Sequence, residues 1–151
     1  MSTPITLIVY GIPAPQGSKK FVGMSKKGRG ILVESSAKVK PWRQAVTMAA
    51  VESEARVVGP VSVSMVFTLP RPAAAKKRAH HATKPDLSKL VRSTEDSITD
   101  AGLWEDDSRV CRTLSQKLYV GGEGSLASPG AVIVITPLID QTSVARKAGT
   151  L

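Results

Sequence analysis

The segment AVIVITPLI, residues 131–139, constrains the fold more than any other feature because it is the most apolar stretch of the chain. Val and Ile dominate this segment, and β-branched side chains pack well on a pleated sheet. Its length is about half of the roughly 18 apolar residues that a membrane-spanning helix requires. We therefore predict that residues 131–139 form a central strand of a sheet.

Other segments also have the character of strands. Residues 61–69, VSVSMVFTL, carry apolar side chains at every second position, which is the period of a half-buried strand. Residues 3–12 and 109–120 have weaker patterns of the same kind. Positions 14–30 are rich in Gly, Ser and Lys and precede the short apolar run 31–33. We expect a basic loop or hairpin arm there, with residues 31–33 as its returning strand.

Two segments have the periodicity of helices. Apolar side chains recur at spacings of three and four residues as far as Glu54, after Ser35 and Ser36, either of which can cap a helix. The second predicted helix covers residues 86–101, where Asp86 follows Pro85 and is a good N-cap.

Composition and element order together indicate one folded domain. Hydrophobic residues make up 42% of the 151-residue chain, which is enough for a buried core and excludes wholesale disorder. Strands mixed with two main helices favour an α+β domain on a single mixed sheet. We place this domain at residues 1–140 and predict a polar tail at residues 141–151.

The charge balance restricts the class of partner. The 21 Lys and Arg residues exceed the 12 Asp and Glu residues and leave a net charge of +9, which predicts an anionic partner, either nucleic acid or an acidic membrane surface. No basic amphipathic helix with a large apolar face supports the membrane alternative. The candidate phosphate contacts, each with solubility as its alternative role, are Lys19, Lys20, Lys76, Lys77, Arg78 and Lys84.

Several single side chains have a simpler interpretation. One cysteine, Cys111, excludes an internal disulfide, and the N-terminus lacks the basic region of a secretory signal, so we expect a cytoplasmic protein. Cys111 is predicted to be a buried strand residue. His80 and His81 have no Cys or His partner at metal-ligand spacing and are predicted to be loop residues near phosphate. Trp104 is predicted to pack in the core, with a wedge between unstacked bases as the alternative.

More than half of the acidic residues lie between positions 86 and 107, which is unusual in a basic chain. At 100° steps the apolar side chains of the second predicted helix share one side, and Lys89, Arg92, Ser93 and Asp96 fall with Asp86 on the opposite flank. A glycine turn can fold the cluster 105–107 back beside the helix. One interpretation is a divalent-metal site, since Mg²⁺ prefers hard oxygen ligands. The other, which spacing alone favours, is an Arg92–Asp96 ion pair with solvated acidic turn residues.

A resemblance to a known family changes this balance. The string K-P-D-x-x-K-L-x-R-x-x-x-D-x-[IL]-T, followed by W-x-D-D-x-x-V, runs from Lys84 to Val110. It resembles the signature of the RusA family of Holliday junction resolvases. The resemblance implies a RusA-like fold and a small homodimeric endodeoxyribonuclease, typical of phages and prophages. Such an enzyme requires Mg²⁺, with Mn²⁺ as a substitute, and cuts four-way DNA junctions by paired symmetric nicks in a bacterial or phage-infected cell.

The resemblance also assigns roles to single residues. Asp86 and Asp107 match the family's first and distal catalytic aspartates, and Arg92 occupies the position of a functionally important lysine. By this match Asp86 and Asp107 hold Mg²⁺ with the help of Asp96 or Asp106, and Lys89 and Arg92 steady the scissile phosphate.

Ser88 departs from the family pattern, because the family has a second aspartate at this position. A hydroxyl is a weaker metal ligand than a carboxylate, so reduced activity or a changed metal requirement is expected. The departure also keeps open an alternative of a different class, a non-catalytic DNA-binding protein with an architectural or regulatory role. Cleavage of a synthetic junction distinguishes the two.

Overall fold

The structure, a computed structural model, describes residues 3–16, 19–24, 30–34 and 37–139. Its main sheet has the strand order β1-β6-β4-β5. The sheet is mixed, since β6 pairs antiparallel with both β1 and β4, whereas β4 and β5 run parallel. The four strands are β1 (Ile5–Tyr10), β4 (Val61–Leu69), β5 (Val110–Tyr119) and β6 (Gly130–Pro137).

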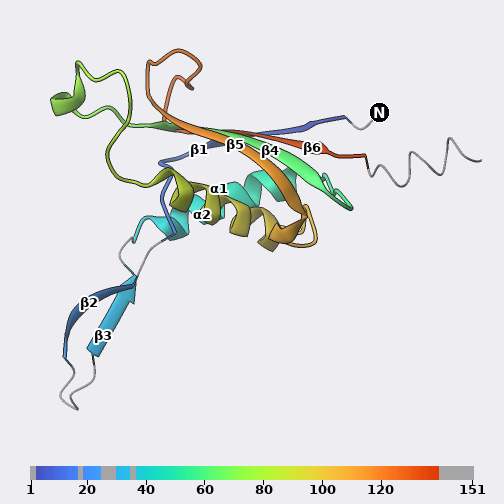
Figure 1. The fold of residues 1–151 in the computed structure, drawn as a ribbon, viewed down its shortest axis with the longest axis horizontal. Coiled ribbons are helices and arrows are strands. Elements are labelled where there is room, and N and C mark those ends of the chain that lie inside the picture. Colours follow the sequence, from blue (N-terminus) through green and yellow to red (C-terminus); the bar gives the residue numbers. More distant parts are fainter. Residues whose placement is uncertain (1–2, 17–18, 25–29, 35–36, 140–151) are drawn as a thin grey trace, which may run out of the picture.

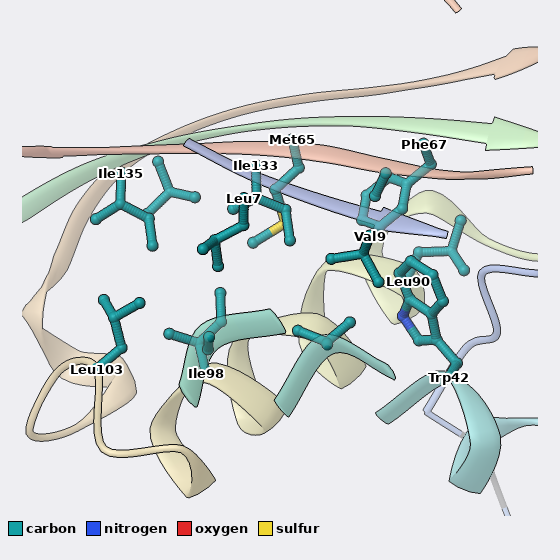
Figure 2. Packing of buried hydrophobic residues seen from close by; sticks show 14 of the residues in the cluster. Leu7, Val9, Trp42, Met65, Phe67, Leu90, Ile98, Leu103, Ile133 and Ile135 are labelled. Atoms are coloured by element: carbon teal, nitrogen blue, oxygen red, sulfur yellow. The ribbon is translucent and has the colours of Figure 1, made fainter. Parts of the chain in front are cut away.

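The segment expected to be a central strand is β6, which lies between β1 and β4 as predicted. Alternation along the neighbouring strand β4 is also as expected, because Val63, Met65 and Phe67 all point into the core and are buried. Figure 2 shows Met65 and Phe67 of β4 directed from the sheet toward the helices, together with Ile133 and Ile135 of β6. The period-two pattern therefore identifies the inner face of the sheet.

Two helices cover this inner face, α1 (Val39–Glu52) and α2 (Leu87–Asp100) (Figure 1). Trp42 of α1 is 1% exposed and packs against Phe67, with ring centroids 6.4 Å apart. Its indole Nε1 donates a hydrogen bond to Thr94 Oγ1 of α2 at 3.2 Å, which joins the two helices inside the core. The α+β domain on one mixed sheet with two main helices is thus confirmed.

Residues 19–24 and 30–34 form a separate two-stranded antiparallel sheet, which agrees with the predicted hairpin arm. It consists of β2 (Lys19–Met24) and β3 (Gly30–Glu34), and it projects away from the main sheet on the side of the helices (Figure 1). Two short 3₁₀ helices complete the fold, η1 (Ala73–Ala75) and η2 (Asp107–Arg109).

Several local predictions need correction or fall outside the described residues. Helix α1 begins at Val39 with Lys38 as an N-cap that makes no side-chain hydrogen bond, and the predicted caps Ser35 and Ser36 lie outside the described residues. Ser93 is buried rather than on the polar flank of α2, because its Oγ donates to the Ala14 carbonyl at 2.7 Å. The predicted polar tail, residues 141–151, also lies outside the described residues.

Cys111 was predicted to be buried, but it is exposed. The reason lies in the pairing of the edge strand β5: its register with β4 shifts between Val61 and Ser62, so Val110 and Arg112 have partners on β4 and Cys111 between them has none. Of the helices that the structure describes, none has the length and apolar character needed to cross a membrane.

Candidate active site

Asp86 lies at the start of α2 in an exposed position. It is the N-cap residue, its side chain is 54% exposed, and its Oδ2 lies 3.8 Å from Lys89 Nζ one turn later. The chain that enters the helix is held by β5, because Lys117 Nζ donates hydrogen bonds to the carbonyls of Thr83 at 2.6 Å and Pro85 at 2.9 Å. The backbone around Asp86 is thus anchored to the sheet while its carboxylate faces solvent.

Asp107 lies at the other end of α2, in the turn that follows the helix. Gly102 has a φ of +76°, a conformation that favours glycine, and it lets the chain reverse after the last helical turn. Asp107 then returns to the helix, where Thr99 Oγ1 donates a short hydrogen bond to Asp107 Oδ1. This arrangement confirms that the acidic segment 105–107 folds back beside α2.

A buried side chain stands behind this contact. Trp104 is 1% exposed, and its Nε1 donates to Thr99 Oγ1 at 2.7 Å. The hydroxyl of Thr99 therefore accepts from the indole and has its own proton available for Asp107. The three side chains form a hydrogen-bonded chain that leads from the core to the Asp107 carboxylate. We call this chain of hydrogen bonds the Trp104–Thr99–Asp107 relay. Trp104 packs in the core, as predicted, but its N–H also orients this relay.

Two further carboxyl groups lie close to Asp107. Burial, followed by a hydrogen bond that the protonated Asp96 carboxyl donates to the Asp107 side chain, raises the pKa of Asp96. Burial, followed by the charges of Asp107 and Asp96, raises the pKa of Glu95 to about 7. Glu95, Asp96 and Asp107 therefore form a carboxylate cluster in which burial and mutual repulsion favour the protonated forms of Glu95 and Asp96.

Two arginines flank the carboxylate cluster. Arg43 of α1 and Arg92 of α2 both act on Asp96 and oppose the rise in its pKa. Arg43 is itself held by Asp100, with an Nη2–Oδ2 distance of 2.7 Å. The exposed side chain of Arg92, which the sequence placed at the scissile phosphate, lies one turn of α2 before Asp96. Positive charge thus surrounds a site whose centre is acidic.

The neighbouring acidic residues, Asp106 and Glu105, make contacts within their own turn. Asp106 Oδ2 accepts from the Ser108 backbone N–H at 2.9 Å and caps η2. Hydrogen bonds from the Ser108 side chain and then from its backbone N–H lower the pKa of Asp106. Glu105 Oε2 pairs with Arg109 Nη2 at 2.7 Å. Asp106, predicted as an optional metal ligand, therefore has a local structural role.

The predicted set of carboxylates is divided between the two ends of α2. Asp96 and Asp107 come together, whereas Asp86 precedes Asp96 by ten residues, which is about 15 Å along a helix axis. Within the described ranges, no three side chains of His, Cys, Asp or Glu are grouped so that they could hold a metal ion. One copy of the chain thus presents a two-carboxylate site with Glu95 beside it, and a separate Asp86.

The predicted DNA-contacting cations lie on separate parts of the fold. Lys76, Lys77 and Arg78 are exposed in the loop after η1, and Lys84 is exposed just before α2. The remaining two, Lys19 and Lys20, are in β2 of the hairpin arm. Sequence reasoning gave no role to Glu95 or Thr99. The signal that could have identified Thr99 is its position in the motif, as the T of D-x-[IL]-T. Nothing in the local sequence pattern indicated that Glu95 is half-buried.

The raised pKa of Glu95 predicts a dependence of stability on pH. Because the folded pKa of about 7 exceeds the ordinary value of 4.5, this group stabilises the fold at low pH and loses that contribution as the pH rises through 7. With solvent screening of a half-buried group, we expect a loss of about 1–2 kcal/mol between pH 5 and 8. The free energy of unfolding is measured with urea in the presence of EDTA at each pH. Glu95→Gln should remove this part of its decline between pH 5 and 8. Glu105→Gln, the exposed control, should keep it, and equal declines in all three proteins would contradict the assignment.

Comparison with known proteins identifies the family of the chain. The family model for the endodeoxyribonuclease RusA matches residues 11–126, which is most of the chain and contains the whole of α2 and the turn that carries Asp107. A search of curated proteins finds no match. Because the family match spans well over half of the chain and includes the carboxylate cluster, this chain belongs to the RusA family and is an endodeoxyribonuclease.

Proposed function

We propose that this endodeoxyribonuclease is a Holliday junction resolvase that cuts four-way DNA junctions by paired, symmetric, metal-dependent nicks. The observation that carries the proposal is the fixed position of Asp107, which the Trp104–Thr99–Asp107 relay holds beside Asp96 in a chain of the RusA family. A net charge of +9 suits a polyanionic substrate. Such an enzyme would act in the cytoplasm of a bacterial or phage-infected cell.

The donor set of the carboxylate cluster suits Mg²⁺, with Mn²⁺ as a substitute. Mg²⁺ is typically held by one or two carboxylates and by substrate phosphate, and Asp96 and Asp107 are two carboxylates within hydrogen-bonding reach of each other. The mutual repulsion that helps to raise the pKa of Glu95 is the kind that a bound cation relieves. A divalent cation bound there would supply charge neutralisation at the phosphate and an activated water.

The side chains around the cluster then have distinct tasks. Arg92 is exposed one turn before Asp96, and its charge acts on that carboxyl, so it would bind the phosphate that enters the site. Its guanidinium would stabilise charge that builds on the phosphoryl oxygens during hydrolysis. Lys89 lies one turn earlier, beside Asp86, and would bind the adjacent phosphate of the same strand.

We propose a homodimer as the active form. A four-way junction offers two equivalent strands for cutting, and a two-fold dimer presents two identical sites to them. Within one chain Asp86 and the carboxylate cluster lie about 15 Å apart along α2. A catalytic site that contains Asp86 as well as Asp107 therefore requires side chains from two copies, and this is the role we propose for Asp86.

A synthetic four-way junction tests the proposal directly. The protein is incubated with Mg²⁺ and either the junction or a linear duplex of the same sequence, and products are resolved on denaturing gels. Symmetric nicks in two opposing strands of the junction alone are the expected result. A shifted band without cleavage in either Mg²⁺ or Mn²⁺ would favour the second candidate, a non-catalytic DNA-binding protein, which the presence of Ser88 keeps open.

Ser88→Asp should keep the junction-cleaving rate or raise it by up to about tenfold, since it restores a carboxylate near the start of α2. Ser88 is exposed, and an acidic residue in the first turn of a helix is favourable, so the fold should tolerate the change. Ser88→Asn is the uncharged control and should match wild type. Cleavage rates over a range of Mg²⁺ concentrations provide the measurement. A folded but inactive Ser88→Asp variant would contradict the expectation that a carboxylate at position 88 supports the metal site.

A further inference from the structure

A second concave site lies at the opposite end of α2 from the carboxylate cluster. It is a pocket of about 410 Å³ between the end of β1, the end of β4 and the segment that leads into α2. This volume lies within the range of sites that take small organic groups. Pro85 forms part of the wall, and Asp86 follows it directly. The pocket therefore adjoins one of the two acidic positions of the proposed nuclease.

The charge of the pocket has one sign. Lys38, Arg71 and Lys84 line it, and no carboxylate does so within the described part of the chain. The other walls are largely apolar and include several prolines. A ligand that suits such walls has a flat apolar part and a negative charge. A nucleotide of DNA combines the two, as base and phosphate.

The wall also holds a polar group without a partner. His81, which was predicted to be a loop residue near phosphate, is 8% exposed, and its buried Nδ1 has no hydrogen-bond partner among the described residues. Its ring packs on the buried ring of Tyr119 with centroids 4.7 Å apart, and Arg71 lies over the same tyrosine ring at 4.4 Å. Buried polar atoms are normally hydrogen-bonded. The fixed His81 ring therefore offers a ligand a packing surface in the pocket wall, while its unpaired Nδ1 is itself covered.

A neutral His81 ring is suited to an uncharged partner such as a base. Burial and, secondarily, the charge of Lys117 lower the pKa of His81, although the carbonyls of His81 and Thr83 oppose this. A neutral imidazole has one donor and one acceptor nitrogen. Neither nitrogen of the neutral ring carries a positive charge, so the ring suits contact with an uncharged base, and the lysines that line the pocket would bind the phosphate.

We propose that this pocket takes one unstacked nucleotide of the DNA substrate, with its base against the proline wall and the His81 ring, and its phosphate at Lys38 and Lys84. The inference rests on the proposed function, since it assumes a DNA substrate whose strands are distorted at the crossover. Enzymes that act on DNA commonly hold displaced bases in pockets of this kind. The nucleotide held there would fix the position of the strand relative to Asp86.

The two adjacent histidines allow a direct test by NMR. They are the only histidines in the chain, and His80 is exposed and does not line the pocket, so its Cε1–H signal is an internal control. The probes are a single-stranded DNA tetranucleotide and the same backbone without bases. We expect the intact tetranucleotide to shift the His81 signal saturably and the abasic one to shift it by less than about half as much. Equal shifts with both probes, or no His81 shift, would overturn the proposal.

A matched pair of bulky substitutions gives a second measurement. Thr83 lines the pocket and is exposed, so Thr83→Trp should fill the pocket without unfolding the protein. It should abolish the His81 shift and weaken four-way junction binding by about fivefold or more, the loss expected for one stacked base. Ala82→Trp, one residue away and outside the pocket, should leave both unchanged. Melting temperatures confirm that both variants fold.

The outcomes also separate this inference from the proposed function. If wild type cuts the junction while Thr83→Trp binds and cuts as well as wild type, the pocket is not a nucleotide site and the resolvase proposal stands. If wild type does not cut any junction but the intact tetranucleotide shifts His81 selectively, the resolvase proposal fails while the nucleotide site is supported.

Discussion

Asp107→Asn should abolish junction cleavage while it leaves junction binding at or above the wild-type level. The substitution removes one negative charge from the carboxylate cluster, and with it the electrostatic basis for a divalent cation beside Asp96. Metal-assisted stabilisation of the reacting phosphate is worth several kcal/mol, so a loss of at least about 10³-fold in rate is expected. The asparagine carbonyl can still accept from Thr99 Oγ1, so the turn should keep its structure.

Three measurements check the Asp107→Asn result. Single-turnover cleavage gives the rate, junction binding in Ca²⁺ gives the affinity, and thermal unfolding shows whether the fold is intact. Glu105→Gln is the matched control, because it removes one charge from the same turn at a side chain paired with Arg109. Cleavage by Asp107→Asn at the wild-type rate would remove Asp107 from the catalytic site.

Thr99→Val should lower the cleavage rate by about 10–100-fold, as is typical for residues that orient metal ligands. Valine has the shape of threonine but can neither donate to Asp107 nor accept from Trp104 Nε1, so the relay loses its middle member. The Asp107 carboxylate is then free to rotate, and half-saturation should require more Mg²⁺. Thr99→Ser keeps the hydroxyl and should recover most of the activity.

A control is needed because Thr99→Val also leaves the buried indole N–H of Trp104 unpaired, which costs about 1–3 kcal/mol of stability. Thr47→Val removes another threonine hydroxyl that binds α2, through the Ser97 carbonyl at 3.3 Å. It should lower the melting temperature without a change in the Mg²⁺ requirement. If Thr99→Val changes stability alone, the relay is structural and does not position Asp107.

The elements of the fold were predictable because their signals are local. Alternation identified residues 61–69, and the apolar run identified residues 131–139, with boundaries close to those of β4 and β6. The pairing of strands was not predictable in this way. A parallel β4–β5 pair leaves β5 at an edge, and the register shift in that pair leaves Cys111 without a partner, so its exposure depends on a long-range arrangement.

The residues of the candidate site could be predicted from the sequence, but their arrangement in space could not. The motif indicated Asp86, Asp96 and Asp107, but the order of residues along the chain does not state which of them meet in space. That depends on the turn at Gly102, which returns Asp107 to the last turns of α2 and leaves Asp86 at the first. The burial of His81 was likewise hidden, because it arises from the ring of Tyr119 on a strand distant in sequence.

Helix α2 is attached to one strand at both of its ends. Thr99 binds Asp107 just before β5 begins, and Lys117 near the end of β5 binds the carbonyl of Pro85 just before α2 begins. Helix and strand therefore run in opposite directions as a closed loop, and axial sliding of the helix breaks both attachments at once. In native-state hydrogen exchange, the amides of these two elements should open together with one common free energy. Helix α2 and strand β5 thus fix the distance between Asp86 and Asp107, and this distance changes only when the helix and the strand separate.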